Sequence, residues 1–159
     1  MRLEEMGVIH QGKLLIAIKS NDIINSPFDR SLIGCFFTAI QDFNHKLYSQ
    51  EIEILSGKNY CVIFYFQSLA LELFNTSLTQ SDNAKLEDYL LGYVVIKNNR
   101  KNLEAYSRKK ILPLLKKIML RFKYQYYGSN FVEISEFKDF EEIILKEFEK
   151  RDFQFSSKK

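Results

Sequence analysis

Short apolar runs separated by a polar turn predict two strands at the beginning of the chain. Residues 5–10 and 13–19 are largely apolar, and Gln11 and Gly12 lie between them. Glycine reaches positive φ angles without strain, as a tight hairpin turn requires. The pattern therefore predicts a hairpin of two strands, followed by a polar loop at residues 20–27.

Apolar residues at steps of three and four predict a long helix over residues 28–48. The side chains expected on its inner face are Leu32, Ile33, Phe36, Ile40, Phe43 and Leu47. Ser26 or Asp29 offers the side-chain oxygen that is typical of a helix N-cap. Glycine inside a helix costs about 1 kcal/mol relative to alanine, so we expect Gly34 to be there because a small residue lets the helix approach a sheet closely.

Three further segments have the patterns of strands. Residues 51–55 alternate between charged and apolar, as a half-exposed strand does. Residues 60–66 and 89–96 are apolar at successive positions, which is typical of strands covered on both faces. The pattern at residues 67–88 leaves a strand, a helix and a loop open.

The helical period returns in the last third of the chain. Residues 100–127 carry an apolar stripe made of Leu103, Tyr106, Ile111, Leu114, Leu115, Ile118, Phe122 and Tyr126. Pro113 removes one backbone donor and is expected to kink or restart this helix. A last helix opens at Ser135, with an inner face made of Phe137, Phe140, Ile143, Ile144 and Phe148. Residues 153–159 are expected to form a flexible tail.

The predicted order of elements is β-β-α-β-β-β-α-α. Consecutive strands with short turns favour an antiparallel sheet, and two strands that are apolar on both faces require cover on both sides. The sequence therefore predicts an α/β (α+β) three-layer sandwich, with a five-stranded antiparallel sheet between the first helix and the last two. Residues 1–152 are expected to form one domain.

This order, the hairpin at residues 7–19, the Phe-rich first helix and the closing helix pair resemble the longin domain, which has a profilin-like fold. The segment LIGCFFTAIQDF at residues 32–43 looks especially like longin-type proteins of the archaea related to eukaryotes. The long connection at 67–88 and the Pro-containing helix at 100–127 depart from the family pattern. The resemblance implies a non-catalytic adaptor in small-GTPase regulation or membrane-trafficking-like assemblies.

The resemblance also implies a class of partner: a small GTPase, another longin or roadblock domain, or a second copy of the chain. Two alternatives stay open. One is a roadblock-like scaffold, which the opening hairpin disfavours because that fold begins with a helix. The other is an α/β enzyme or small-ligand-binding domain, which needs a concave pocket with convergent polar groups.

The residue inventory offers little support for catalysis. There is no phosphate-binding glycine motif, and the spacing of Cys35, Cys61, His10 and His45 matches no zinc pattern. We therefore expect no cofactor, no metal and no enzymatic activity. Both cysteines lie in apolar runs and are interpreted as buried free thiols. The acids Glu133, Glu136, Asp139, Glu141 and Glu142 are interpreted as a solvated helix face.

Charge is distributed unevenly along the chain. The net charge is only +3, so no nucleic acid is expected, but residues 100–127 hold nine basic residues and one acid. The predicted basic face consists of Lys109, Lys110, Lys116, Lys117 and Lys123. It is either a solvated face partly balanced by the acidic last helix or a contact for an acidic protein or an anionic membrane.

The predicted partner-binding residues lie on the second strand and the first helix. An apolar edge strand needs cover, and Leu14, Ile16 and Ile18 could obtain it by pairing with another chain. The neighbouring helix offers four candidate exposed contacts for a GTPase, namely Asp29, Arg30, Asn44 and His45.

The sequence also suggests where the protein resides. Acids at Glu4 and Glu5 disfavour a signal peptide, and no apolar stretch reaches the roughly 18 residues of a membrane span. We expect a cytoplasmic, soluble, stand-alone longin-like unit without a fusion helix.

Overall fold

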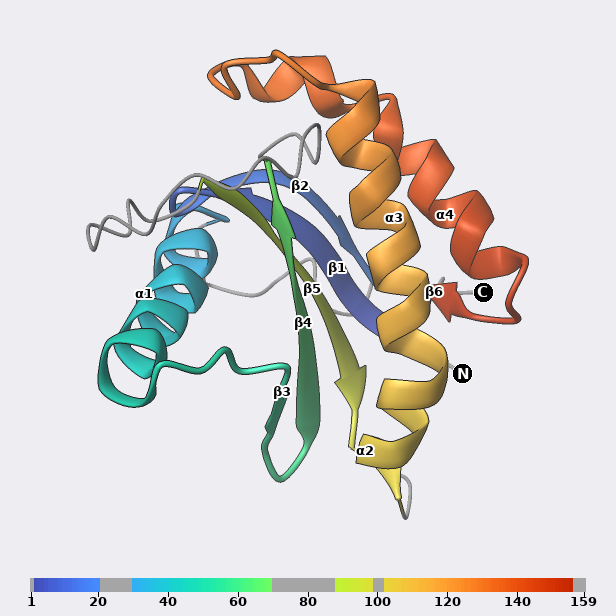
Figure 1. The fold of residues 1–159 in the computed structure, drawn as a ribbon. Helices are drawn as coiled ribbons and strands as arrows, with labels where there is room; N and C mark the ends of the chain where they lie inside the picture. The colour runs from blue at the N-terminus through green and yellow to red at the C-terminus, as the bar shows by residue number, and fades with distance from the viewer. Residues whose placement is uncertain (1, 21–29, 70–87, 99–101, 156–159) are drawn as a thin grey trace, which may run out of the picture.

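A computed structural model describes residues 2–20, 30–69, 88–98 and 102–155 of the chain. An open, antiparallel sheet lies at its centre, with the strand order β2-β1-β5-β4-β3 (Figure 1). These strands are β1 (Arg2–His10), β2 (Lys13–Lys19), β3 (Ile54–Ser56), β4 (Tyr60–Ser68) and β5 (Tyr89–Lys97). The hairpin turn falls at Gly12, whose φ of 80° only glycine adopts readily. The five antiparallel strands that the sequence predicts are confirmed.

Helices cover both faces of this sheet. The helix α1 (Arg30–Tyr48) lies on one face, and α3 (Leu112–Gln125) and α4 (Phe140–Glu149) lie on the other (Figure 1). Each interface contains its own apolar core, so β1, β4 and β5 are buried on both sides. The mixed α/β arrangement with a layer of helices on each side of the sheet agrees with the prediction.

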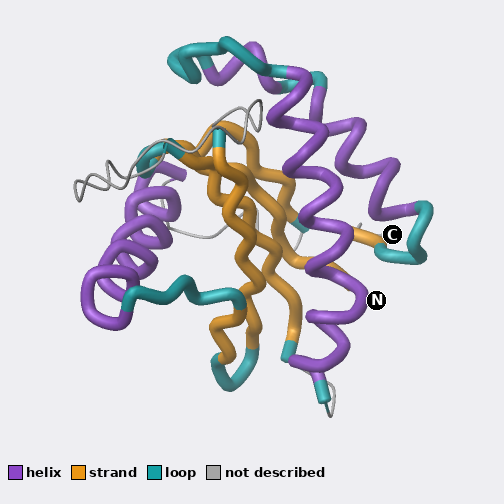
Figure 2. Tube along the Cα trace, in the orientation of Figure 1, coloured by secondary structure: helices purple, strands orange, loops and turns teal. Residues whose placement is uncertain are grey.

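The long helix after β5 changes its winding near Pro113. It begins as α2 (Leu103–Tyr106), widens into the π-helical turn η2 (Ser107–Ile111) and continues as α3, forming one rod in Figure 2. Pro113 lies in the first turn of α3, where its missing N–H leaves no gap in a regular α-helical ladder. The predicted restart at Pro113 is therefore found, in the form of a π-helical turn.

The end of the chain differs from the expected tail. Gln154–Phe155 form a sixth strand, β6, which pairs in parallel with Arg2 and Leu3 of β1. Phe153 is buried, and its ring packs against Phe148 with centroids 5.9 Å apart. The apolar character of Phe153 and Phe155 therefore adds these residues to the fold, and residues 156–159 lie outside the described part.

Three later boundaries also differ from the prediction. The strand expected at 51–55 is Ile54–Ser56, because the backbone of Ile52 hydrogen-bonds to a helix side chain instead of a strand. The last helix begins at Phe140, and the 3-10 turn η3 (Ile134–Phe137) precedes it. At 67–88, β4 reaches Ser68 and Leu69 N–H donates to Asp88 O at 2.9 Å, and residues 70–87 lie outside the described part.

Candidate protein-docking surface

The first helix contacts the sheet through small and aromatic residues. A Cβ atom on Gly34 would overlap with the carbonyl oxygen of Gly12, so the α1 backbone lies directly against the β1–β2 turn. This confirms that Gly34 allows a close approach. One turn further along, the ring of Phe37 packs edge-on against Tyr93 and Phe64, with centroids 4.8 and 5.2 Å away. These contacts determine which side of α1 faces the sheet.

Polar contacts hold the second half of α1 in the same orientation. The buried amide of Gln41 donates to Ile52 O at 2.9 Å and accepts from Ile52 N–H at 3.0 Å. The hydroxyl of Tyr89 donates to the carboxylate of Asp42 at 3.3 Å. Burial and the Asp42 carboxylate raise the pKa of Tyr89 to about 12, so this hydroxyl stays protonated at neutral pH. Rotation of α1 about its own axis would break all of these contacts.

The fixed orientation leaves an apolar row on the outside of α1. The exposed fractions are 55% for Leu32, 59% for Phe36, 65% for Phe43 and 58% for Leu47. Ala39 between them is exposed and Ile40 is half-buried. We call these six residues the outer stripe. Contiguous exposed apolar surface on a folded domain marks an interaction site more often than isolated apolar residues do.

The outer stripe overturns the prediction for the inner face of this helix. Four of the six side chains predicted to be buried, Leu32, Phe36, Phe43 and Leu47, point away from the sheet. Apolar residues occupy more than half of the helix circumference, and the buried face is centred instead on Gly34, Phe37 and Gln41. Cys35 is likewise exposed, which corrects its predicted burial, whereas Cys61 is buried as expected.

The structure places the predicted edge residues differently. The strand β2 does lie at an edge of the sheet, but Leu14 and Ile16 are only 5% and 1% exposed and Ile18 is half-buried. Their side chains belong to the cores, so only the backbone edge of β2 remains for pairing. At one end of β2, the Lys13 ammonium donates to Val132 O of the segment before η3.

The structure describes the side chains of two of the four helix positions proposed for a GTPase, Asn44 and His45. Asp29 lies outside the described residues, and Arg30 is the first residue of α1. The amide of Asn44 donates to Gln50 O at 2.7 Å, which closes the turn after the helix. His45 is exposed near the C-terminal end of α1.

One residue of the predicted basic face, Lys117, is paired with an acid. Lys117 donates to Glu147 of α4 at 2.7 Å, and Arg121 and Lys150 lie 3.7 and 3.3 Å from the same carboxylate. The hydrogen bond from Lys117, assisted by Lys150, holds the pKa of Glu147 below its ordinary value. Glu147 of the last helix thus balances part of the charge of this face.

Only part of that face is open to solvent. Lys109, Lys110, Lys116 and Lys117 are exposed, but Lys123 is 4% exposed and does not belong to an exposed face. The physical reason is that Met119, one turn earlier on the same side of α3, lies directly against Gly92 of β5, so this side of the helix faces the sheet. Helical spacing alone placed Lys123 with the others.

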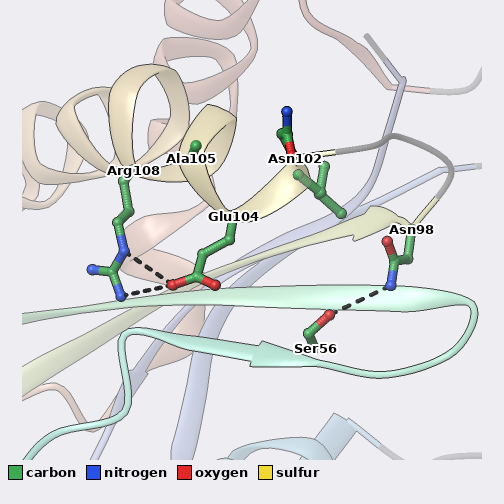
Figure 3. A pocket seen from close by; sticks show the side chains of 7 residues that line it. Ser56, Asn98, Asn102, Glu104, Ala105 and Arg108 are labelled. Atoms are coloured by element: carbon green, nitrogen blue, oxygen red, sulfur yellow. Dashed lines mark hydrogen bonds and ion pairs between the residues drawn. The ribbon is translucent and has the colours of Figure 1, made fainter.

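A polar cleft of about 530 Å³ lies where β3, β5 and α2 meet (Figure 3). The Arg108 guanidinium beside it donates to Glu53 and, at 3.2–3.3 Å, to Glu104. The hydrogen bond to Glu53, and then that to Glu104, raises the pKa of this guanidinium further. Asn98 donates to Ser56 Oγ at 3.4 Å and to Gly57 O at 2.6 Å. Arg108 is thus bonded to two carboxylates, and Asn98 is bonded separately to Ser56 and Gly57.

The described residues contain no group of three or more His, Cys, Asp or Glu side chains that could hold a metal ion. His10 instead bonds to the Asp88 carboxylate at 2.8 Å and lies against the ring of Phe131. None of the helices within the described ranges is both long enough and apolar enough to cross a membrane.

No protein-family model matches the chain, and no curated protein and no solved structure with significant similarity to it was found. The fold therefore defines the class of protein: a mixed α/β domain with an open antiparallel sheet between helices. Within the described part of that domain, the outer stripe is an apolar surface that the packing of the sheet and helices does not use.

Proposed function

We propose that this chain is a non-catalytic protein-interaction domain of the longin type, acting in small-GTPase regulation or trafficking-like assemblies. The observation that carries the proposal is the outer stripe. A helix that is held rigidly against the sheet presents four large apolar side chains to solvent. Exposing such side chains opposes solubility unless a partner covers them, and a protein that presents them on a rigid element loses little entropy when it binds.

The resemblance to longin domains supports the same surface. The segment at residues 32–43, which carries much of that resemblance, also contains most of the outer stripe. Its partner needs an apolar groove or an apolar helix face, because the stripe itself carries no charged side chain. A small GTPase or another longin or roadblock domain meets this requirement.

The two rival functions have weaker support. An enzyme or ligand-binding domain would use the polar cleft, but Arg108 is already engaged by Glu53 and Glu104, which leaves the group with a net negative charge. An anionic membrane would use the basic face, where Lys117 is already paired with Glu147 and Lys123 is buried. The outer stripe has no comparable intramolecular engagement among the described residues.

The test is site-specific photo-crosslinking in cells of the native organism. A photoreactive phenylalanine analogue replaces Phe43 in the stripe or Tyr124 on α3, two aromatic positions that are each 65% exposed. The proposal predicts a discrete adduct from position 43, with a small GTPase or a longin or roadblock protein in it, and none of this kind from position 124. Identical adduct patterns from the two positions would contradict it.

A further inference from the structure

The outer stripe has an internal symmetry. Its residues form two rows with a spacing of four, Leu32–Phe36–Ile40 and Ala39–Phe43–Leu47. Read towards the C-terminus, the first row is Leu, Phe and Ile. Read towards the N-terminus, the second row is Leu, Phe and Ala, so each row runs from Leu through Phe to a central aliphatic residue. The arrangement is therefore the same when the helix is inverted about a point between Ala39 and Ile40.

We propose that the occupant of the outer stripe is the outer stripe of a second copy, with the two α1 helices packed antiparallel about a twofold axis at Ala39 and Ile40. This inference rests on the proposed function, because it names the partner of the same surface. A twofold interface must be self-complementary, with residue i facing j and j facing i. The inverted repeat satisfies this condition residue by residue.

The pairing follows from the axis. Leu32 of one copy faces Leu47 of the other, Phe36 faces Phe43, and Ala39 faces Ile40. A crossing angle of about 20°, as in helix bundles, keeps the two stripes in contact along their length. The small side chain of Ala39 at the centre lets the two backbones approach, and the four Phe rings fill the space on either side of it.

The size of the surface sets the strength of the dimer. The four large side chains present on the order of 400 Å² of apolar surface on each copy, which gives roughly 800 Å² for the pair. Stable interfaces bury at least about 1,000 Å² in total, so with the flanking residues this dimer falls at the lower limit and dissociates in the micromolar range. The chain therefore exchanges between a monomer and a dimer, and any other protein bound through the stripe competes with the second copy.

Sedimentation equilibrium of the full chain from about 1 to 500 µM tests the association. We expect a reversible monomer–dimer equilibrium that Phe36→Asp weakens at least about 100-fold, because twofold symmetry places the substitution in the interface twice. The matched control is Tyr124→Asp, an aromatic position on α3 that is 65% exposed against 59% for Phe36, which leaves the equilibrium unchanged. A wild-type chain that stays monomeric at 500 µM, or a dimer that survives Phe36→Asp, overturns the inference.

Cysteine pairs test the orientation in a Cys35→Ser background, which removes the exposed native thiol. Leu32→Cys mixed with Leu47→Cys gives a disulfide-linked heterodimer in an antiparallel pair, whereas the thiols of two Leu32→Cys chains would lie about 22 Å apart along the axis. Cross-linking of Leu32→Cys with itself, at a higher yield than in the mixture, would indicate parallel helices and contradict the proposal. The Leu32→Cys and Leu47→Cys variants both retain Phe36 and Phe43.

The outcomes also separate this inference from the proposed function. A monomeric wild-type chain whose Phe43 analogue still cross-links to a GTPase, or to another longin or roadblock protein, refutes the second copy and leaves the adaptor function intact. A dimer lost in Phe36→Asp, together with cellular adducts that contain only this chain, supports the second copy and contradicts a separate partner at the stripe.

Discussion

The helices on the two faces of the sheet differ in how much of their aromatic surface is buried. On the α3–α4 face, Phe122 is fully buried among Phe131, Phe137 and Phe140, with ring centroids 5.1–6.4 Å away. On the α1 face, Phe37 is the one aromatic residue of the described helix that is buried, and Phe36 and Phe43 are exposed. The first face buries its aromatic side chains, and the second leaves apolar surface exposed.

The largest change in the free energy of unfolding is expected for Phe122→Ala. Removing a fully buried ring from this aromatic cluster costs the transfer free energy and leaves a cavity, so the free energy of unfolding should fall by about 3–5 kcal/mol. Urea unfolding followed by circular dichroism measures it. Leu120→Ala, on the exposed side of the same helix, serves as the control and should cost less than about 1 kcal/mol. Equal losses for the two variants would refute the description of this face.

Gly34→Ala tests the contact between α1 and the hairpin turn. At an exposed helical position this change would gain about 1 kcal/mol. Here the new methyl group meets the carbonyl of Gly12, so we expect a loss of about 1–3 kcal/mol in the free energy of unfolding. A gain in stability in urea unfolding would show that α1 does not lie against the turn.

Gln41→Ala removes the two hydrogen bonds between α1 and Ile52. Because the amide is buried and both of its partners are backbone groups, the loss should be about 1–2 kcal/mol. The exposed Lys46 supplies the comparison, since Lys46→Ala on the same helix should change stability by less than about 0.5 kcal/mol. Faster amide exchange at Ile52 in Gln41→Ala would assign the loss to this contact.

The smallest change in stability is expected at Glu147 of α4, which forms an ion pair with Lys117 of α3. Its pKa lies below the ordinary value of 4.5 in the folded chain, so the charged form stabilises folding above that pH. This contribution is lost as the pH falls through 4.5 and then through the lower folded value. Glu147→Gln should cost about 1 kcal/mol at pH 7 and progressively less towards pH 3. Thermal melts of both proteins from pH 3 to 7 measure this difference, and a constant gap would contradict the linkage.

Much of the fold follows from periodicity alone. The five long or alternating apolar segments became strands in a sheet, and Gly12 and Pro113 predicted the hairpin turn and the change of winding in the long helix. These features depend on local conformational preferences and on burial, which a single sequence records. The strand at Gln154–Phe155 could not be predicted in the same way, because two residues show no period and their partners, Arg2 and Leu3, lie at the other end of the chain.

The candidate site was much less accessible from the sequence. A helical period shows that apolar residues gather on one side, but α1 carries apolar residues over a wide arc, and the pattern does not say which part of it is buried. The deciding contacts are tertiary: Gly34 against Gly12, and Gln41 on Ile52. The sequence did contain one signal: the apolar arc of α1 is wider than one sheet face can cover, which indicates that part of it stays exposed.

The outer stripe must be free of intramolecular contacts in the single chain if it is to bind any partner. The decisive measurement is urea unfolding of Phe43→Asp at a protein concentration below about 0.5 µM, where the proposed dimer is dissociated. We expect a free energy of unfolding within about 0.5 kcal/mol of the wild type, because Phe43 is 65% exposed. A loss of about 2 kcal/mol or more would contradict a free stripe, since it would show that the chain itself buries this ring.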